Sequence, residues 1–281
     1  MYASALHSEP VGPVALQRQR ALGRVALAAS RRGPATRALR VAEEGSLRVR
    51  MPRVGTGLEA VLVNTAGGVA CGDRFSVDVE AGPDAQLVLT TPAAEKVYRS
   101  DGPTAEIAVR LTLAPGAEVA WLPQETILFD RARLRRRLDA DVAGDARLLL
   151  CEAAVFGRRA HGEEVREGFF EDRWRIRRDR RLVHADTLRF DGPIAGLLNR
   201  PAVAGGARAL ATIFYVAPDA EARLDDARAL LGASACAAGA SAWNGCLAVR
   251  FLARDAAELR RDAVVFLEGF RGCRLPRVWQ S

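Results

Sequence analysis

Residues 107–121 read IAVRLTLAPGAEVAW, and the pattern in this stretch decides the fold class. Apolar residues alternate with polar or small residues as far as Leu113. A period of two places successive side chains on opposite faces of an extended chain, which is typical of a strand with one buried face. Ala114-Pro115-Gly116 predicts a turn, and the apolar positions resume at Val119 and Trp121. The stretch therefore predicts two strands joined by a tight turn.

The same pattern continues on both sides of this stretch. Alternating apolar residues recur at residues 75–79, 86–90 and 138–142, and turn signals occur at residues 81–84 and 144–145. Short strands separated by turn signals at intervals of roughly 8–12 residues are typical of a sandwich or another layered β structure.

Two segments break the strand pattern. Asp219–Leu231 places its apolar residues on one helical face, with Asp219 as the expected N-cap and Gly232 as the residue that ends the helix. Asp255–Phe270 has the same periodicity, and Asp255 with an acidic residue three positions later resembles a capping box. The sequence therefore predicts a mainly β, two-layered, sandwich-like single domain with about two short helices.

The two ends of the chain differ in composition. Residues 1–35 are rich in Arg, Pro and Gly, which predicts an irregular basic N-terminal segment with one edge strand near Arg24–Ala28. Residues 36–281 contain no linker and no repeat, so we expect one β-rich domain there. Val25–Ala29 is too short for a signal peptide, and glycines, serines and an asparagine interrupt the uncharged run Ala229–Val249. We expect a cytoplasmic protein with no membrane contact.

The charge balance permits an acidic partner. Basic residues outnumber acidic ones 41 to 34, and Lys96 is the only lysine, so the arginine excess indicates a composition bias. Six arginines lie in residues 173–181, where Trp174 and Ile176 alternate with arginines. This alternation predicts a half-buried strand with a basic exterior. A basic nucleic-acid-binding module is the alternative function, although such a surface needs aromatic residues on its basic face.

Signatures of conventional catalysis are missing from the sequence. There is no G-x-S-x-G, H-E-x-x-H or Walker lysine motif, and only three histidines are present. The five cysteines show no C-x-x-C pair, which argues against a disulfide framework or a zinc ribbon. Nothing in these residues supports enzymatic activity or a tightly bound cofactor, and the question of activity stays open at this point. A hydrolase that uses Glu125 and Glu152 is the weaker alternative.

Carboxylates occur in two unusual settings in the first half of the chain. The glycine-rich residues 64–74 predict a permissive turn between strands, or a functional turn that presents Cys71 and Asp73. Glu95 stands beside the lysine, as in many surface ion pairs.

Two further carboxylates lie in the middle of the chain. Glu125 lies in a mostly apolar stretch, so it needs either an arginine partner or a place on an internal or metal-handling path. Cys151, Glu152, His161 and Glu163 combine ligand types that divalent transition metals accept. That segment predicts either a transient metal site or a buried cysteine near solvated charges.

Seven segments, in order from residue 62 to the C-terminus, carry a resemblance to a known family. They are residues 62–68 (LVNTAGG), 72–74 (GDR), 95–99 (EKVYR), 121–130 (WLPQETILFD), 156–159 (FGRR), 243–245 (WNG) and 275–279 (LPRVW). With them the chain resembles the urease accessory protein family UreD, also called UreH. Cys71 departs from the family, which usually has glycine there, and this puts a strained φ at that position in doubt.

The resemblance implies both a fold and a role. Members are similar to two-layered β structures with a few short helices, and they are not enzymes. They act in hetero-oligomeric complexes with UreF and the GTPase UreG on apo-urease, and nickel is thought to pass through an internal passage toward the urease active site. The resemblance thus suggests a transient nickel path with no tightly bound ion, and no nucleic acid as partner. Its candidate ligands are Asp73, Glu125, Glu152 and Asp186, with Glu95, Cys71 and Glu163 as weaker candidates.

Overall fold

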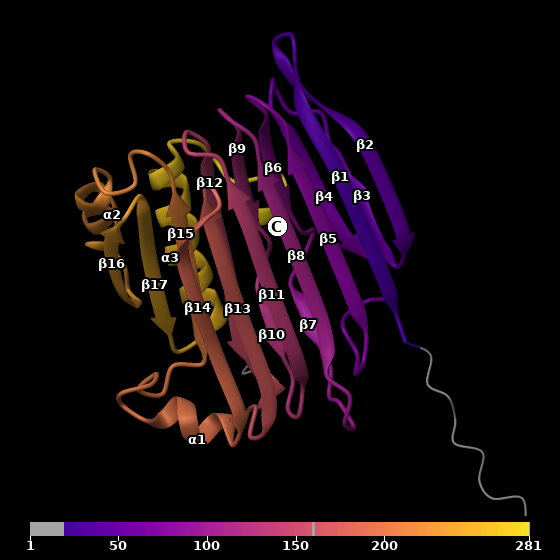
Figure 1. The fold of residues 1–281 in the computed structure, drawn as a ribbon. Coiled ribbons are helices and arrows are strands. Elements are labelled where there is room, and N and C mark those ends of the chain that lie inside the picture. The colour runs from indigo at the N-terminus through magenta and orange to yellow at the C-terminus, as the bar shows by residue number, and fades with distance from the viewer. Residues whose placement is uncertain (1–19, 159–160, 281) are drawn as a thin grey trace, which may run out of the picture.

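Two β-sheets packed face to face form the molecule, which a computed structural model describes over residues 20–158 and 161–280 (Figure 1). The first sheet, sheet A, contains seven strands in the order β14-β13-β11-β8-β5-β1-β2. Their bounds are β1 Leu22–Arg32, β2 Ala35–Gly45, β5 Arg74–Ala81, β8 Ala105–Leu113, β11 Arg133–Val142, β13 Gly168–Arg178 and β14 Arg181–Gly192.

The second sheet, sheet B, contains ten strands, of which eight follow the order β16-β17-β15-β12-β9-β6-β4-β3. The short strands β10 and β7 extend it beside β12. The bounds are β3 Leu47–Arg50, β4 Leu58–Asn64, β6 Gln86–Thr90, β7 Glu95–Val97, β9 Glu118–Leu122, β10 Thr126–Leu128, β12 Arg147–Phe156, β15 Ala209–Val216, β16 Ala237–Trp243 and β17 Cys246–Ala253. The predicted mainly β, sandwich-like fold is confirmed.

The central part of the chain winds like a parallel β-helix, because successive strands alternate between the two sheets. We call this winding the parallel coil. Neighbouring central strands are parallel within each sheet, as in β5, β8 and β11 of sheet A and in β6, β9 and β12 of sheet B. The turns between the coils stack as well: the Asp84 N–H donates to the Pro115 carbonyl at 3.1 Å, and the Gly116 N–H donates to Asp145 Oδ1 at 3.1 Å. Each turn signal in the sequence thus ends one strand of the coil.

Alternate residues of both sheets fill the space between them. Leu111, Leu138 and Leu148 are among the fully buried side chains of this inner core. A second apolar cluster lies on the outer face of sheet B, the face that points away from sheet A, and helix α3 (Ala256–Arg271) packs there together with α2 (Leu224–Leu231). Helix α1 (Ile194–Asn199) and the short 3-10 helix η2 (Arg277–Trp279) complete the described elements. No helix in the described part of the chain is both long and apolar enough to span a membrane.

The start of the domain differs from our expectation. Residues 22–32 form β1, which pairs with β2 on one side and β5 on the other, so β1 is an internal strand and β2 is the edge. The physical reason is the alternation of Val25, Leu27 and Ala29: all three are buried, and Val25 and Leu27 belong to the inner core. The predicted irregular segment therefore does not extend to residue 35, and residues 1–19 lie outside the described residues.

The two predicted helices are present, but their caps differ in outcome. In α3, Asp255 is the N-cap as predicted, and its Oδ1 accepts a hydrogen bond from the Glu258 N–H at 2.8 Å. Helix α2 starts only at Leu224, so the prediction of Asp219 as its N-cap is wrong. Asp219 instead binds Arg147 at 2.6 Å, a partner that lies far away in the sequence.

We predict that Asp255→Ala lowers the free energy of unfolding by about 1 kcal/mol, because it leaves the Glu258 N–H of α3 without its acceptor. Chemical denaturation followed by circular dichroism measures the change. Glu44→Ala on the exposed strand β2 is the control and should change stability by less than about 0.5 kcal/mol. Equal effects of the two substitutions would contradict the capping role.

Candidate functional site

Three charged side chains meet in the layer between the two sheets. Arg136 lies on β11 and is the pairing partner of Asp172 on the adjacent strand β13. Glu152 reaches them from β12 of sheet B. All three are at least 92% buried, with exposed fractions of 5% for Arg136, 8% for Asp172 and 5% for Glu152. We call Arg136, Glu152 and Asp172 the inter-sheet charge cluster.

Hydrogen bonds satisfy every carboxylate oxygen of this cluster. The Arg136 guanidinium donates to Glu152 Oε2 and, at 2.5 Å, to Asp172 Oδ2. Trp121 Nε1 donates to Glu152 Oε1 at 2.7 Å, and Trp174 Nε1 donates to Asp172 Oδ1 at 3.0 Å. Buried charges are normally paired in this way, because an unpaired charge in a low-dielectric interior is very costly.

Burial also changes the proton affinity of the cluster. Loss of solvation is the main cause that raises the pKa of Glu152 to about 7. The charge of Asp172 contributes in the same direction, and Arg136 opposes the shift. The same burial raises the pKa of the neighbouring Cys151 thiol far above its ordinary value, so this sulfur stays protonated at neutral pH. The carboxylate oxygens of the cluster are therefore all hydrogen-bonded, Arg136 Nε is left without a hydrogen-bond partner in the described part of the chain, and Glu152 exchanges its proton near neutrality.

Two of the predicted nickel ligands hold parts of the fold together. Asp73 is buried, and its two oxygens accept hydrogen bonds from the Ala21 N–H at 2.8 Å and the Ala70 N–H at 2.7 Å. Glu125 accepts a hydrogen bond from Arg260 of α3 at 3.1 Å. The expected arginine partner of Glu125 thus exists, but it comes from a helix that is distant in sequence.

The fourth predicted ligand, Asp186, lies at the edge of the sandwich. It forms an ion pair with Arg250, which links β14 of sheet A to β17 of sheet B, and its side chain is 39% exposed. Glu152 points into the interior, so Glu152 and Asp186 do not both face bulk solvent.

The weaker candidates are also engaged. Burial raises the pKa of Glu95 to about 7, and the Asn64 amide donates to both of its oxygens at 3.3 Å. Glu163 pairs with Arg158. The Cys71 Sγ atom lies 3.0 Å from Asp101 Oδ1, and Cys71 is not among the residues with positive φ, so the side chain causes no backbone strain.

The predicted carboxylates are thus held in separate hydrogen-bonded networks. In residues 20–158 and 161–280, no group of three or more His, Cys, Asp or Glu side chains has the geometry to hold a metal ion. The Glu152 oxygens already accept hydrogen bonds from Trp121 and from the Arg136 guanidinium, and this guanidinium lies where a metal ion bound to Glu152 would lie.

The sequence analysis did not predict two members of the cluster, Arg136 and Asp172. A signal for them exists in the period of two. Arg136 falls in phase with the buried Leu134 and Leu138, and Asp172 falls in phase with the buried Phe170 and Trp174. A charged residue in the apolar phase of a strand therefore marks a buried ion pair.

The arginine-rich strand β13 has the predicted two faces. Trp174 and Ile176 are buried, whereas Arg175 is exposed. Carboxylates compensate many arginines on the outer face of sheet A, in the ion pairs Arg24–Asp78, Arg110–Asp78, Arg135–Glu106, Arg135–Glu171, Arg137–Glu106, Arg177–Asp141 and Arg189–Glu171. Of the β13 arginines only Arg177 takes part in these pairs, so the compensation lowers the positive charge of the sheet around β13 more than that of β13 itself.

We predict that Arg136→Met lowers the free energy of unfolding by about 3–5 kcal/mol at neutral pH, because it leaves two buried carboxylates without their cation. Urea denaturation measures the loss. Arg110→Met is the control: it removes an exposed ion pair with Asp78 and should cost less than about 1 kcal/mol. Adding Glu152→Gln and Asp172→Asn to Arg136→Met should recover most of the stability. A triple variant as unstable as the single variant would contradict this account.

Glu152 should also make stability depend on pH. Between its unfolded pKa of 4.5 and its folded pKa of about 7, the folded state holds a proton that the unfolded state has released. The contribution of Glu152 to the free energy of unfolding therefore falls as pH rises through this window. We expect Glu152→Gln to remove this component, seen as a difference between wild-type and variant denaturation curves across the window. Glu80→Gln, on an exposed part of sheet A, should leave the profile unchanged.

Comparison with known proteins agrees with the resemblance found in the sequence. The family model described as UreD urease accessory protein matches residues 21–280. A urease accessory protein UreD of Xanthobacter autotrophicus is 60% identical over 285 residues, which cover 99% of both chains. Proteins of the same name from a Methylobacterium species and Azorhizobium caulinodans are 60% and 59% identical, over 98% and 94% of this chain and 99% and 97% of their own. Because these matches span nearly the whole sequence, the chain belongs to the UreD family of urease accessory proteins.

Proposed function

We propose that this chain is a non-catalytic maturation factor for urease. In this role it binds apo-urease together with UreF and UreG in the cytoplasm and helps deliver nickel to the urease active site. The observation that carries the proposal is the family match, which spans residues 21–280 and therefore the whole described sandwich apart from its first residue.

The arrangement of the carboxylates supports a scaffold more than a hydrolase. Paired-carboxylate hydrolysis needs two carboxyl groups on either side of one reacting bond in an accessible cleft. Glu152 is enclosed between the sheets, whereas Glu125 is bound to Arg260 of α3. The two groups lie in different networks, so they do not form such a pair.

Nickel in this proposal is cargo, and its path uses oxygen ligands that bind weakly, because a tight site would trap the ion. We propose Asp73, Glu125, Glu152 and Asp186 as stations along that path. Glu152 is the interior station, because it lies between the sheets. In the described conformation both of its oxygens accept hydrogen bonds, so a passing ion has to displace Trp121 or Arg136.

The test is a deletion of this gene in its own organism. We expect the urease subunits to be made at normal abundance but to contain little or no nickel, as measured by elemental analysis of purified urease. Expression of the wild-type chain should restore nickel and activity. Fully active urease in the deletion strain would contradict the proposal.

Two variants separate the nickel path from the maturation role. Glu152→Gln and Asp172→Asn each remove one carboxylate from the inter-sheet charge cluster, but only Glu152 is a proposed station. We expect Glu152→Gln to lower the nickel content of urease more than Asp172→Asn at equal abundance of the two variants. Equal nickel content would reject the path while leaving the maturation role intact.

A further inference from the structure

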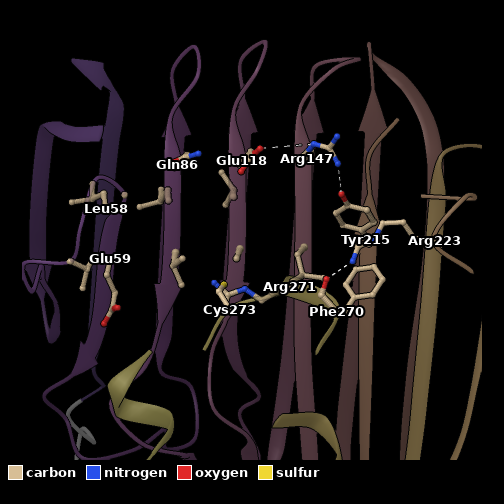
Figure 2. Close-up of a pocket in the computed structure, with 17 residues that line it drawn as sticks. Leu58, Glu59, Gln86, Glu118, Arg147, Tyr215, Arg223, Phe270, Arg271 and Cys273 are labelled. Atoms are coloured by element: carbon tan, nitrogen blue, oxygen red, sulfur yellow. Dashed lines mark hydrogen bonds and ion pairs between the residues drawn. The ribbon is translucent and has the colours of Figure 1, made fainter. Parts of the chain in front are cut away.

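A groove of about 600 Å³ opens on the outer face of sheet B (Figure 2). Figure 2 shows Gln86, Glu118 and Arg147 along one edge, and Arg271 and Phe270 along the opposite edge. The volume lies within the usual range of ligand sites, roughly 300–1,000 Å³. We call this hollow the sheet B groove.

Its floor is a single row of outward-facing residues on five adjacent strands. The pairing register places them side by side, in the order Glu59, Val88, Ala120, Leu149 and Tyr215. The row is hollow over Val88 and Ala120, which are small. Helix α3 covers only the Tyr215 end of the row, where the Phe270 ring packs on the Tyr215 ring at 5.3 Å between ring centres. The C-terminal helix η2 instead covers the neighbouring row of outward-facing residues, which contains Thr90 and Leu122. There Trp279 Nε1 donates to Thr90 and to the Leu122 carbonyl, both at 3.1 Å.

Opposite charges without close partners flank this floor. Glu59 is 9% exposed as a whole residue, and its carboxylate oxygens are open to solvent. Within the described part of the chain this carboxylate has no hydrogen bond and no ion pair, only a longer-range attraction to Arg271. Burial raises the pKa of Glu59, as expected for a carboxyl group that lacks a counter-ion. The Arg271 guanidinium donates to the Arg274 carbonyl at 3.3 Å and has no carboxylate within ion-pair distance in that same part of the chain.

The other cations at the groove are already engaged. Arg147 binds Asp219 and Tyr215, and Arg223 stacks on Phe270 at 3.7 Å from the ring centre. The charged groups of the groove with neither an ion-pair partner nor a stacked aromatic ring in the described part of the chain are therefore the Glu59 carboxylate on one side and the Arg271 guanidinium on the other. This contrasts with the outer face of sheet A, where opposite charges are paired.

The chemistry of the groove selects among ligands. The lining carries both signs of charge, with Glu59 and Glu118 on the acidic side and Arg147, Arg223 and Arg271 on the basic side, so a ligand of a single sign does not match it. A peptide segment carries both a basic and an acidic group, and the aliphatic stem of a lysine or arginine packs on an apolar floor such as Val88 and Ala120. Charge complementarity thus favours a protein segment over a small ion.

We propose that the sheet B groove binds a segment of a partner protein that places a basic side chain on Glu59 and an acidic side chain on Arg271. This inference rests on the proposed function, because the partner belongs to the complex that assembles on apo-urease. The described surface then has two distinct faces: an ion-paired face on sheet A and a recognition groove on sheet B.

The experiment fills the groove and measures binding. Ala120→Trp places an indole over the floor, and Arg271→Glu reverses the free cation. The matched control is Ala108→Trp, a small residue of β8 on the outer face of sheet A. Purified wild-type and variant chains, with circular dichroism to verify folding, are titrated with UreF, with apo-urease and with their mixture with UreG.

We expect each groove variant to weaken binding by about tenfold or more, which corresponds to about 1.4 kcal/mol, while Ala108→Trp binds like the wild type. Hydrogen exchange of the wild-type complex should show protection at residues 84–90, 116–122 and 268–273. This measurement does not depend on the folding of any variant. Unchanged binding by both variants, or no protection there, overturns the groove. A wild-type dimer that Ala120→Trp dissociates also overturns it in favour of a second copy. A wild-type chain that binds none of the three proteins overturns the proposed function itself.

Discussion

The ion pairs of Arg136 with Glu152 and Asp172 are the constraint on which the rest of the sandwich depends. They connect β11 and β13 of sheet A to β12 of sheet B in a space that is otherwise filled by apolar side chains. A buried charge contributes little net stability, but it makes any arrangement that leaves it unpaired very unfavourable. A shift of one residue in any of these strands would turn a charged side chain outward and its apolar neighbours into solvent. A shift of two residues would keep the apolar side chains inward but would separate Arg136 from its carboxylates. The cluster therefore disfavours a slip that the apolar alternation alone tolerates.

The outer faces of the two sheets differ in how they are shielded from solvent. Sheet A presents arginines paired with carboxylates across neighbouring strands, so its surface is polar and largely neutralised. Sheet B is covered by α2, α3 and the C-terminal segment, apart from the groove. The features that suggest recognition therefore lie on the outer face of sheet B.

The sequence predicted what depends on neighbouring residues and failed where distant residues decide. The strand period of residues 107–113 and the cap at Asp255 are local, and both agree with the structure. Asp219 is also a reasonable cap by local rules, but it is bound by Arg147 of a distant strand. The basic composition of residues 1–35 led to the prediction of an irregular segment, although the apolar residues of β1 alternate and are buried. In the candidate site, Glu152 was predicted as a nickel ligand. Its partner Arg136 was not predicted, because arginines are frequent throughout this chain and an arginine in a strand is therefore a weak signal of burial.

The two indoles that bind the inter-sheet charge cluster have a practical consequence. Trp121 and Trp174 are two of only four tryptophans, and each donates its N–H to a different carboxylate of the cluster. Indole emission responds to the local electric field and to the hydrogen-bond acceptor of its N–H group. Half of the tryptophans of the protein therefore donate a hydrogen bond to its buried charges. The unlabelled chain carries an optical reporter that should respond when a proton or a cation reaches its interior.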